Sequence, residues 1–427
     1  MNQLKRFCKT FLKSKISSNA LFFTIIISLV IALLCSSLIF IAYFHKVQVQ
    51  QNQLKERLIR NANSAIQLLL ASPKKNHQET FDLFGDVKDS VFMGLNVWGT
   101  YEIGHVKAFS HRDSISKSFI VGSVPDSLWK SSLYLVDQGL PVAFAGNTLV
   151  KGTAYLPAAG PISAAVDGKD FSRKKLVEGD IRKSSNKLPD LSAVHLEKML
   201  DQVKSGIQID ILPLKALKTD SIVASFSQPT LKISGKGSVV SLSRITLKGN
   251  LIIASDTLIE VYSSANLENI ILTAPKIVFK DDFKGSVQAF ATDSLITGES
   301  SVFHYPSALV LLETDSIENS PKIIISKKSR VEGVIMVYTS FLDRSQAQLI
   351  ISPEAEIIGQ VYVDGLVNHE GLISGTLVCS KFRLSRPSGT YDNYLLDCTI
   401  DRTSLSSSFL GSSLFNTSRK NIAKWLD

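Results

Sequence analysis

The fold is decided by four similar stretches of sequence: LIIASDTLIEV (Leu251–Val261), IILTAPKIVFK (Ile270–Lys280), VQAFATDSLITG (Val287–Gly298) and LVLLETDSIE (Leu309–Glu318). Each consists of a short apolar strand, a polar corner and a second short strand. Their starts lie about 20 residues apart, which is the length of one coil of a solenoid. A unit this short cannot bury its own apolar face, so neighbouring units must cover one another. The repeat therefore predicts a mainly β fold, a parallel β-helix.

The β-helix is predicted to extend over residues 131–402, well beyond the clear repeat. Residues 131–188 alternate short apolar runs with Gly, Pro, Asn and Asp, and we interpret them as the first coils of the same solenoid. A short helix is predicted near 189–207, where Ser192 can cap a run of apolar residues at helical spacing. Past Ser320 the apolar runs continue, with a shorter expected spacing.

The N-terminal part of the chain predicts a membrane anchor. Residues 20–44 contain no charged side chain, and about 25 residues of helix span roughly 37 Å, more than a bilayer core of about 30 Å. Residues 1–19 are basic and lack acidic residues, so they are predicted to be a cytoplasmic tail. The alternative is a cleaved signal peptide, but the apolar run is longer than such peptides use and no small-x-small site follows it.

The remaining segments are assigned by pattern. Residues 45–72 have apolar residues at helical spacing and predict a juxtamembrane amphipathic helix that continues the membrane helix. Residues 73–130 predict a small mixed α/β region, with two strands around Gly99 or Gly104. Residues 403–427 form a Ser-rich tail, which we expect either to cap the open sheet edge at the end of the solenoid or to be flexible.

Composition excludes some functions and leaves others open. The chain has 427 residues and a net charge of +9, without an Arg/Lys stripe that alternates with aromatics, so no nucleic-acid partner is expected. Cys379 and Cys398 lie 19 positions apart, close to the coil spacing, and could stack on adjacent coils. In an oxidising compartment they could form a disulfide. The alternative is that both are small buried apolar residues.

One stretch resembles a known family. AEIIGQVYVDG (Ala355–Gly365) followed by GLISGTL (Gly371–Leu377) resembles the coil sequence of bactofilins, bacterial cytoskeletal proteins that form polymers. Their coils repeat Ile-x-Gly-x-Val with Gly at tight corners. The resemblance covers a small part of the chain and implies a right-handed β-helix with a structural role. Bactofilins are largely cytoplasmic, whereas here the solenoid follows a membrane anchor.

The N-terminus resembles a minor pilin or pseudopilin, which has a basic leader, a long apolar helix and an amphipathic continuation. The processing motif differs, however. A prepilin site has Gly before the cut and Glu at the fifth mature position, but no Gly occurs around Ser17–Ala20, and Thr24 stands where Glu is expected. A processed pilin would lose its first 15–20 residues.

Catalytic chemistry has little support in the sequence. β-Helices host polysaccharide lyases and hydrolases that use clustered carboxylates, and carboxylates also bind Ca²⁺. Acidic residues do recur at the corners: Asp256, Asp281, Asp282, Asp293 and Asp315. Asp and Ser are also the residues that turns use, because their side chains bind the local backbone. The seven histidines have no spaced nucleophile partner, and no phosphate loop is present. We therefore expect no enzyme activity, catalytic residue, cofactor or metal.

These observations predict a single-pass cell-envelope scaffold protein. It would sit in the inner (cytoplasmic) membrane with a cytoplasmic N-terminus and a periplasmic or extracytoplasmic solenoid, within a pilus- or secretion-like assembly. The expected partners are membrane lipid and either another copy or an envelope protein. The alternatives are a carbohydrate-active β-helix enzyme and a minor pilin-like subunit.

Overall fold

The computed structural model describes residues 18–71, 78–83, 89–110, 113–208, 212–213, 220–235, 237–313, 320–339, 347–415 and 419–426. Most of the N-terminal tail and Asp315 therefore lie outside the described residues. The fold is mainly β, with one long apolar helix towards the N-terminus. The chain divides into two units, Met1–Asn61 and Ala62–Asp427.

Helix α2 runs from Ser18 to Ala71 without interruption. It is long and apolar enough to cross a membrane. The hydroxyls of Thr24 and Ser28 donate to carbonyls one turn earlier, Leu21 O and Ile25 O, at 2.8 Å each. Polar groups in hydrocarbon must be satisfied within the protein, and these two are.

The last turns of α2 belong to the second unit, where small and branched apolar side chains are buried: Ala62, Ala65, Ile66 and Leu69. An antiparallel sheet follows with the strand order β1 (Gln78–Phe81), β2 (Ser90–Trp98), β3 (Tyr101–Ser110), β4 (Asp113–Ser123) and β31 (Lys420–Trp425). Lys117 Nζ on β4 donates to Asn63 Oδ1 at 2.8 Å, which ties the end of the helix to this sheet.

This antiparallel sheet differs from the mixed α/β region expected at 73–130. The described residues there form strands and one short 3-10 helix, η1 (Ser127–Lys130), because alternating side chains are buried along β2 and β3. Gly99, with φ +61°, turns β2 into β3. The fifth strand comes from the C-terminal tail, so the tail completes this sheet instead of ending as a free segment.

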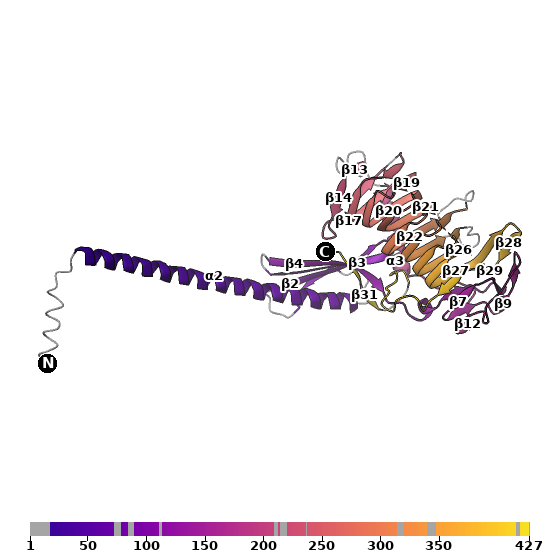
Figure 1. Ribbon diagram of the computed structural model, residues 1–427, viewed down its shortest axis with the longest axis horizontal. Helices are drawn as coiled ribbons and strands as arrows, with labels where there is room; N and C mark the ends of the chain where they lie inside the picture. The colour runs from indigo at the N-terminus through magenta and orange to yellow at the C-terminus, as the bar shows by residue number, and fades with distance from the viewer. Residues whose placement is uncertain are drawn as a thin grey trace. The chain divides into compact units, whose positions relative to one another are not determined.

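The second sheet is parallel and contains most of the strands. Its main strands are β14 (Ser221–Ala224), β15 (Leu231–Ser234), β16 (Val240–Leu242), β17 (Thr246–Gly249), β18 (Leu251–Ala254), β19 (Leu258–Val261), β20 (Asn266–Phe279), β21 (Lys284–Ile296), β22 (Val302–Glu313), β23 (Lys322–Ile325), β24 (Arg330–Thr339), β25 (Gln348–Ile351), β26 (Glu356–His369) and β27 (Leu372–Arg386). Each pairs in parallel with a later one, and Figure 1 shows them stacked in chain order.

The register along the parallel sheet gives the true spacing. The successive partners at one edge are Thr246 with Asn266, Lys284 with Val302, Val302 with Arg330, Arg330 with Glu356 and Glu356 with Leu372. The spacing is longest between Val302 and Glu356 and shortest between Glu356 and Leu372, so the shorter spacing expected past Ser320 occurs only in the last of these steps. Ser294 pairs with Lys322, so β23 continues this side, whereas the end of the fourth quoted stretch, residues 314–318, lies outside the described residues.

Three glycines pair consecutively across β24, β26 and β27: Gly333, Gly359 and Gly375. Their φ angles are 138°, 143° and 157°. A Cβ on Gly359 would lie 2.0 Å from Gly333 O, and one on Gly375 would lie 1.8 Å from Gly359 O. Gly359 and Gly375 are the glycines of the IIG and ISG sequences. Glycine is needed at both positions because the neighbouring backbones approach too closely for a side chain.

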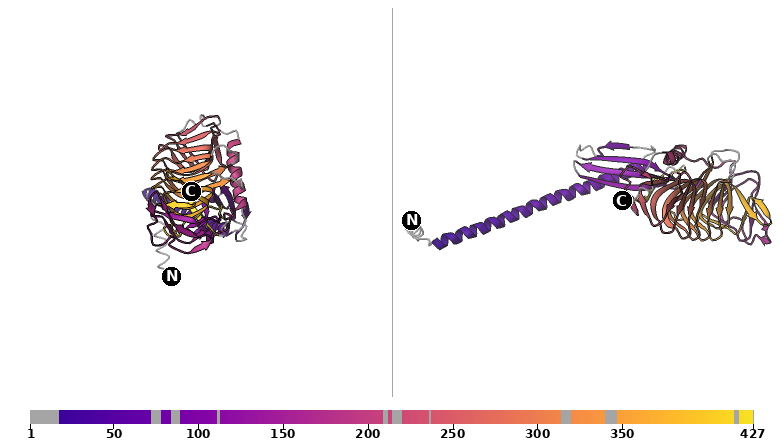
Figure 2. Two further views of the ribbon diagram at one scale, coloured as in Figure 1. Left: turned by 90° about the vertical axis from the view of Figure 1, so that its right-hand side faces the viewer. Right: turned by 90° about the horizontal axis from the view of Figure 1, so that it is seen from above.

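Residues 131–183 belong to the opposite end of the sheet from the one expected. β5 (Leu133–Leu135) pairs with β27, β8 (Ala154–Leu156) pairs with β5, and β12 (Ile181–Lys183) pairs with β8. These strands therefore follow β27 in space, although they precede it in sequence. The chain then passes through α3 (Ala193–Gln208), which lies beside the stacked strands in Figure 2, and reaches β13 (Leu212–Pro213), which pairs with β15.

Candidate functional site: a buried seam between the two sheets

The outer side of the parallel sheet is buried along the middle of β18 to β27. Its apolar side chains form two columns: Ile252, Ile271, Ala308 and Val334 in one, and Phe290, Val310, Met336, Tyr362 and Val378 in the other. They pack against side chains from four other segments: Trp98, Tyr101, Trp129, Met199, Val203, Leu414 and Phe415. We call this second core the seam.

Gln288 is a polar residue in the first column, and both the oxygen and the nitrogen of its amide group are hydrogen-bonded. Its Oε1 accepts hydrogen bonds from Thr100 N at 2.8 Å and Thr100 Oγ1 at 3.0 Å, and its Nε2 donates to Trp98 O at 2.9 Å. All three bonds reach the turn between β2 and β3. Gln288 therefore fixes that turn of the antiparallel sheet on the parallel sheet.

Two more polar residues follow Gln288 in the same column, because Val334 pairs with Gln360 and Gln360 pairs with Thr376. Gln360 Oε1 accepts a hydrogen bond from Ser412 N at 3.2 Å. Thr376 Oγ1 lies 2.9 Å from Trp129 O and 2.7 Å from Ser131 O. One column of side chains thus binds three covering segments, and directional bonds set their positions within an otherwise apolar contact.

Helix α3 binds the same turn from the other side. His195, which is buried, places Nε2 3.0 Å from Gly99 O. Gly99 N donates to Gln202 Oε1 at 2.8 Å. The turn is therefore held between α3 and Gln288, and a Cβ at Gly99 would lie 2.3 Å from Gln288 Oε1.

The C-terminal strand β31 is attached by charged groups. Lys420 Nζ lies 2.6 Å from Glu102 Oε2 on β3, and the two side chains are only 12% and 3% exposed. Lys424 Nζ lies 3.2 Å from Glu268 Oε1 and 3.0 Å from Asn269 Oδ1, both on β20. Loss of one partner of a buried pair leaves an uncompensated charge, so Lys420 and Glu102 must remain together.

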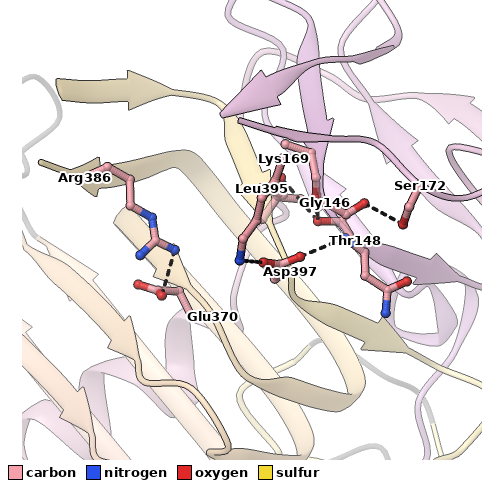
Figure 3. Close-up of polar contacts among 10 residues, drawn as sticks. Gly146, Thr148, Lys169, Ser172, Glu370, Arg386, Leu395 and Asp397 are labelled. Atoms are coloured by element: carbon pink, nitrogen blue, oxygen red, sulfur yellow. Dashed lines mark hydrogen bonds and ion pairs between the residues drawn. The ribbon is translucent and has the colours of Figure 1, made fainter. Parts of the chain in front are cut away.

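A second polar cluster lies in the turn after β29 (Tyr394–Leu396), shown in Figure 3. Asp397 accepts hydrogen bonds from Lys169 Nζ at 2.6 Å and from Asn147 N at 2.8 Å. Burial alone would raise the pKa of this carboxyl, but the two donors outweigh it and the pKa is lowered. Arg386 pairs with Glu370 at 2.8 Å nearby. Lys169 pairs with Asp397, and Arg386 pairs with Glu370. The cluster therefore holds neighbouring segments of the chain together.

The structure has Cys379 and Cys398 as free, buried thiols. Burial raises the pKa of both, that of Cys398 to about 12. Thr399 pairs with Leu372, which places Cys398 beside Gly371 and not beside Cys379. The spacing of 19 misleads because the chain after Cys379 first forms an antiparallel hairpin with β28 (Gly389–Asp392). The disulfide stays a prediction, which a count of free thiols would test.

Two of the acidic corner residues bind backbone N–H groups. Asp256 accepts a hydrogen bond from Gly237 N at 2.9 Å, and Asp281 accepts one from Glu299 N at 2.7 Å. Asp293 Oδ2 accepts a bond from Ser294 Oγ at 3.2 Å, and Asp282 has φ +59°. Among the described residues, no group of three His, Cys, Asp or Glu side chains could hold a metal ion. These contacts are those of turn-forming residues.

The seam was missed at the sequence level, although a signal was present. Strands exposed on one side alternate apolar and polar residues, whereas LIIA, AFA, ALVLL and VIMV are apolar at every position. Such runs indicate burial on both sides. A single Gln within two of the apolar strands, at Gln288 and Gln360, marked the positions where covering segments are bound.

Comparisons with known proteins do not identify a family. No family model matches the chain, and no curated protein matches. Among solved structures, the competence-associated pilin ComZ from Thermus thermophilus is similar at 8% identity over 83% of this chain and 85% of that one. The TM-score is 0.26, which is too low to indicate a shared fold.

Proposed function

We propose that this protein is a single-pass, membrane-anchored scaffold of the cell envelope whose parallel sheet winds as a parallel β-helix. The observation that carries the proposal is the order of the chain. An apolar helix continues into a small antiparallel sheet, and the whole parallel sheet is inserted between its strands β4 and β31. Val124 N donates to Arg419 O at 2.9 Å, so the insertion leaves and returns at one point.

The pairing pattern supports a β-helix. β14 pairs with β17 and β17 with β20, while β15 pairs with β18 and β16 with β19, always in parallel and always three strands later. Long strands such as β20 then cover all three positions, because β17, β18 and β19 each pair with a different part of it. Strands that pair with the strand three positions on are typical of a chain that winds around one axis.

A structural role fits the side chains better than an enzymatic one. Asp256 and Asp281 at the corners bind backbone N–H groups, and the charged cluster around Asp397 is paired internally. The fold provides a long parallel sheet, and the seam sets its position on the antiparallel sheet. A scaffold that presents such a sheet outside the inner membrane, to another copy or to an envelope protein, uses these features directly.

A minor pilin-like subunit is the second candidate. The specific observation in its favour is that α2 is one unbroken helix of 54 residues, whose last turns belong to the same unit as the antiparallel sheet. In this case the first 15–20 residues would be removed, and the apolar half of α2 would pack against other subunits after leaving the membrane. Both candidates place the parallel sheet outside the cytoplasm.

Topology can be tested by labelling one exposed and one N-terminal cysteine. Ser407 is exposed, so Ser407→Cys adds a reactive thiol to the second unit. Cys379 and Cys398 are buried, and Cys35 lies within the apolar segment, which the proposal places in the membrane. In spheroplasts, a membrane-impermeant maleimide should label Ser407→Cys but not the native chain. After lysis the native Cys8 should react as well. Labelling of Cys8 from outside would overturn the proposed orientation.

A further inference from the structure

The end of the second unit that lies beyond β27 finishes in two very short strands. β9 (Pro161–Ser163) pairs with β6 (Val142–Ala145), and β12 pairs with β8. Among the described residues, neither β9 nor β12 pairs with any further strand. An unpaired strand edge offers backbone N–H and C=O groups to a strand of another chain, which leads to end-to-end association unless something blocks it.

Lys183 stands where the next layer of the apolar core would begin. It pairs with Leu156, and Ile181 pairs with Ala154. Leu156 and Ala154 are 1% and 0% exposed and belong to the core inside the parallel sheet. Paired residues in neighbouring parallel strands point to the same side. The inward-facing column therefore ends in an exposed ammonium group.

Ile162 and Ile181 at this end are exposed apolar side chains, but two further residues resist pairing. Arg182 faces the outer side, where its guanidinium lies 5.8 Å from the ring centre of Tyr155 and Nη1 donates to the Tyr155 hydroxyl at 3.3 Å. Pro161 begins β9, and proline has no N–H to donate to a neighbouring strand. Two charges and one proline thus occupy six strand positions.

We propose that β9 and β12 form a stop that prevents a second copy of this chain from extending the sheet at this end. A strand added to β12 would bury the Lys183 ammonium between Leu156 and the added strand and remove it from water. Asp137 is near enough for Lys183 to lower the pKa of its carboxyl, but the two form no ion pair that would offset this cost. The inference goes beyond the scaffold function. Copies of the chain would meet through other surfaces and would not grow end to end here, in contrast to a polymer built by stacking coils.

The test removes the charge of Lys183 and leaves the other residues of β9 and β12 unchanged in the first variant. Lys183→Leu continues the apolar column, and Pro161→Val/Lys183→Leu also restores the missing N–H. Lys175→Leu is the matched control, because Lys175 is an exposed lysine of the same segment but outside the strands. Lys183→Glu replaces one charge by another. Each full-length chain is purified in detergent micelles, and the protein mass per particle is measured by light scattering over a concentration series.

We expect the protein mass per particle of Lys183→Leu to double with increasing concentration, and that of the double variant to rise further. The native chain, Lys175→Leu and Lys183→Glu should keep one common mass. The proposal is overturned if Lys183→Leu keeps the native mass, or if Lys175→Leu or Lys183→Glu associates equally. The particle mass does not depend on membrane orientation, so this result is independent of the labelling experiment above.

Discussion

The two sides of the strands from β18 to β27 are both buried, but different interactions hold them. The inner side is a continuous apolar core, with Phe279, Phe283 and Phe303 in contact at ring-centre distances of 4.8 to 5.4 Å. The outer side, the seam, combines apolar columns with Gln288, Gln360 and Thr376, whose bonds go to other segments. The inner side thus supplies stability, and the outer side positions the antiparallel sheet.

The largest effect is expected from the inner core. Phe303 is fully buried between two other phenylalanines, so Phe303→Ala should lower the free energy of unfolding by about 3–5 kcal/mol. Urea unfolding of the full chain in detergent, followed by circular dichroism, measures this loss. A loss as small as that of an exposed substitution would show that the phenylalanine cluster does not support the sheet.

An acid-dependent loss of stability is expected from His369 on β26. Burial lowers the pKa of its imidazole to about 4, although its contact with Thr399 O works in the other direction. The unfolded chain binds this proton near pH 6.5, so the contribution is complete above pH 6.5 and is lost as pH falls towards 4, by about 3 kcal/mol.

His369→Gln removes this titration while keeping groups that can bind Thr399 O and Gly371 N. Unfolding midpoints of both proteins should be measured at several pH values between 7 and 4. We expect the difference between them to shrink or reverse on acidification. Parallel pH curves would contradict the assignment of the titration to His369.

A smaller effect with a specific consequence is expected at the seam. Gln288→Leu removes the hydrogen bonds to Thr100 N and Trp98 O, and a buried group that is left unsatisfied costs about 1–3 kcal/mol. Hydrogen exchange of the turn between β2 and β3 should increase, while exchange in β24 and β26 stays unchanged. Gln348→Leu on β25, a half-buried position outside the seam, is the control. Equal hydrogen exchange of this turn in the two variants would contradict the positioning role of Gln288.

The smallest effect is expected from the exposed pair Lys169–Asp397. The two side chains are 59% and 37% exposed, so Lys169→Met should cost less than about 1 kcal/mol despite the distance of 2.6 Å. The same urea titration detects the change, and added salt should reduce it. A loss comparable to that of Phe303→Ala would show that the cluster in Figure 3 is part of the main stability of the fold.

The sequence predicted what depends on local pattern. The apolar helix, the mainly β content and the stretches that contain β18 to β22 are visible because alternation and apolar runs are local properties. The position of residues 131–183 beyond β27 could not be predicted, since any edge of a parallel sheet accepts the same kind of strand. The same reason hides β31, whose six residues become a strand only because β4 offers an edge.

The candidate site was less predictable than the fold. Gln288 and Thr100 are 188 positions apart, and nothing local to either residue indicates the other. Cys379 and Cys398 show the opposite failure, because a spacing close to the repeat suggested a column that the register does not form. A regular repeat spacing does not predict contacts that form after a hairpin or across an inserted segment.

The most direct test of the account is the intact mass and N-terminal sequence of the protein isolated from membranes. A permanently anchored scaffold predicts a chain that retains residues 1–19 ahead of the apolar segment. Cleavage close to Asn19 would contradict the permanent anchor and make the minor pilin-like subunit the better description.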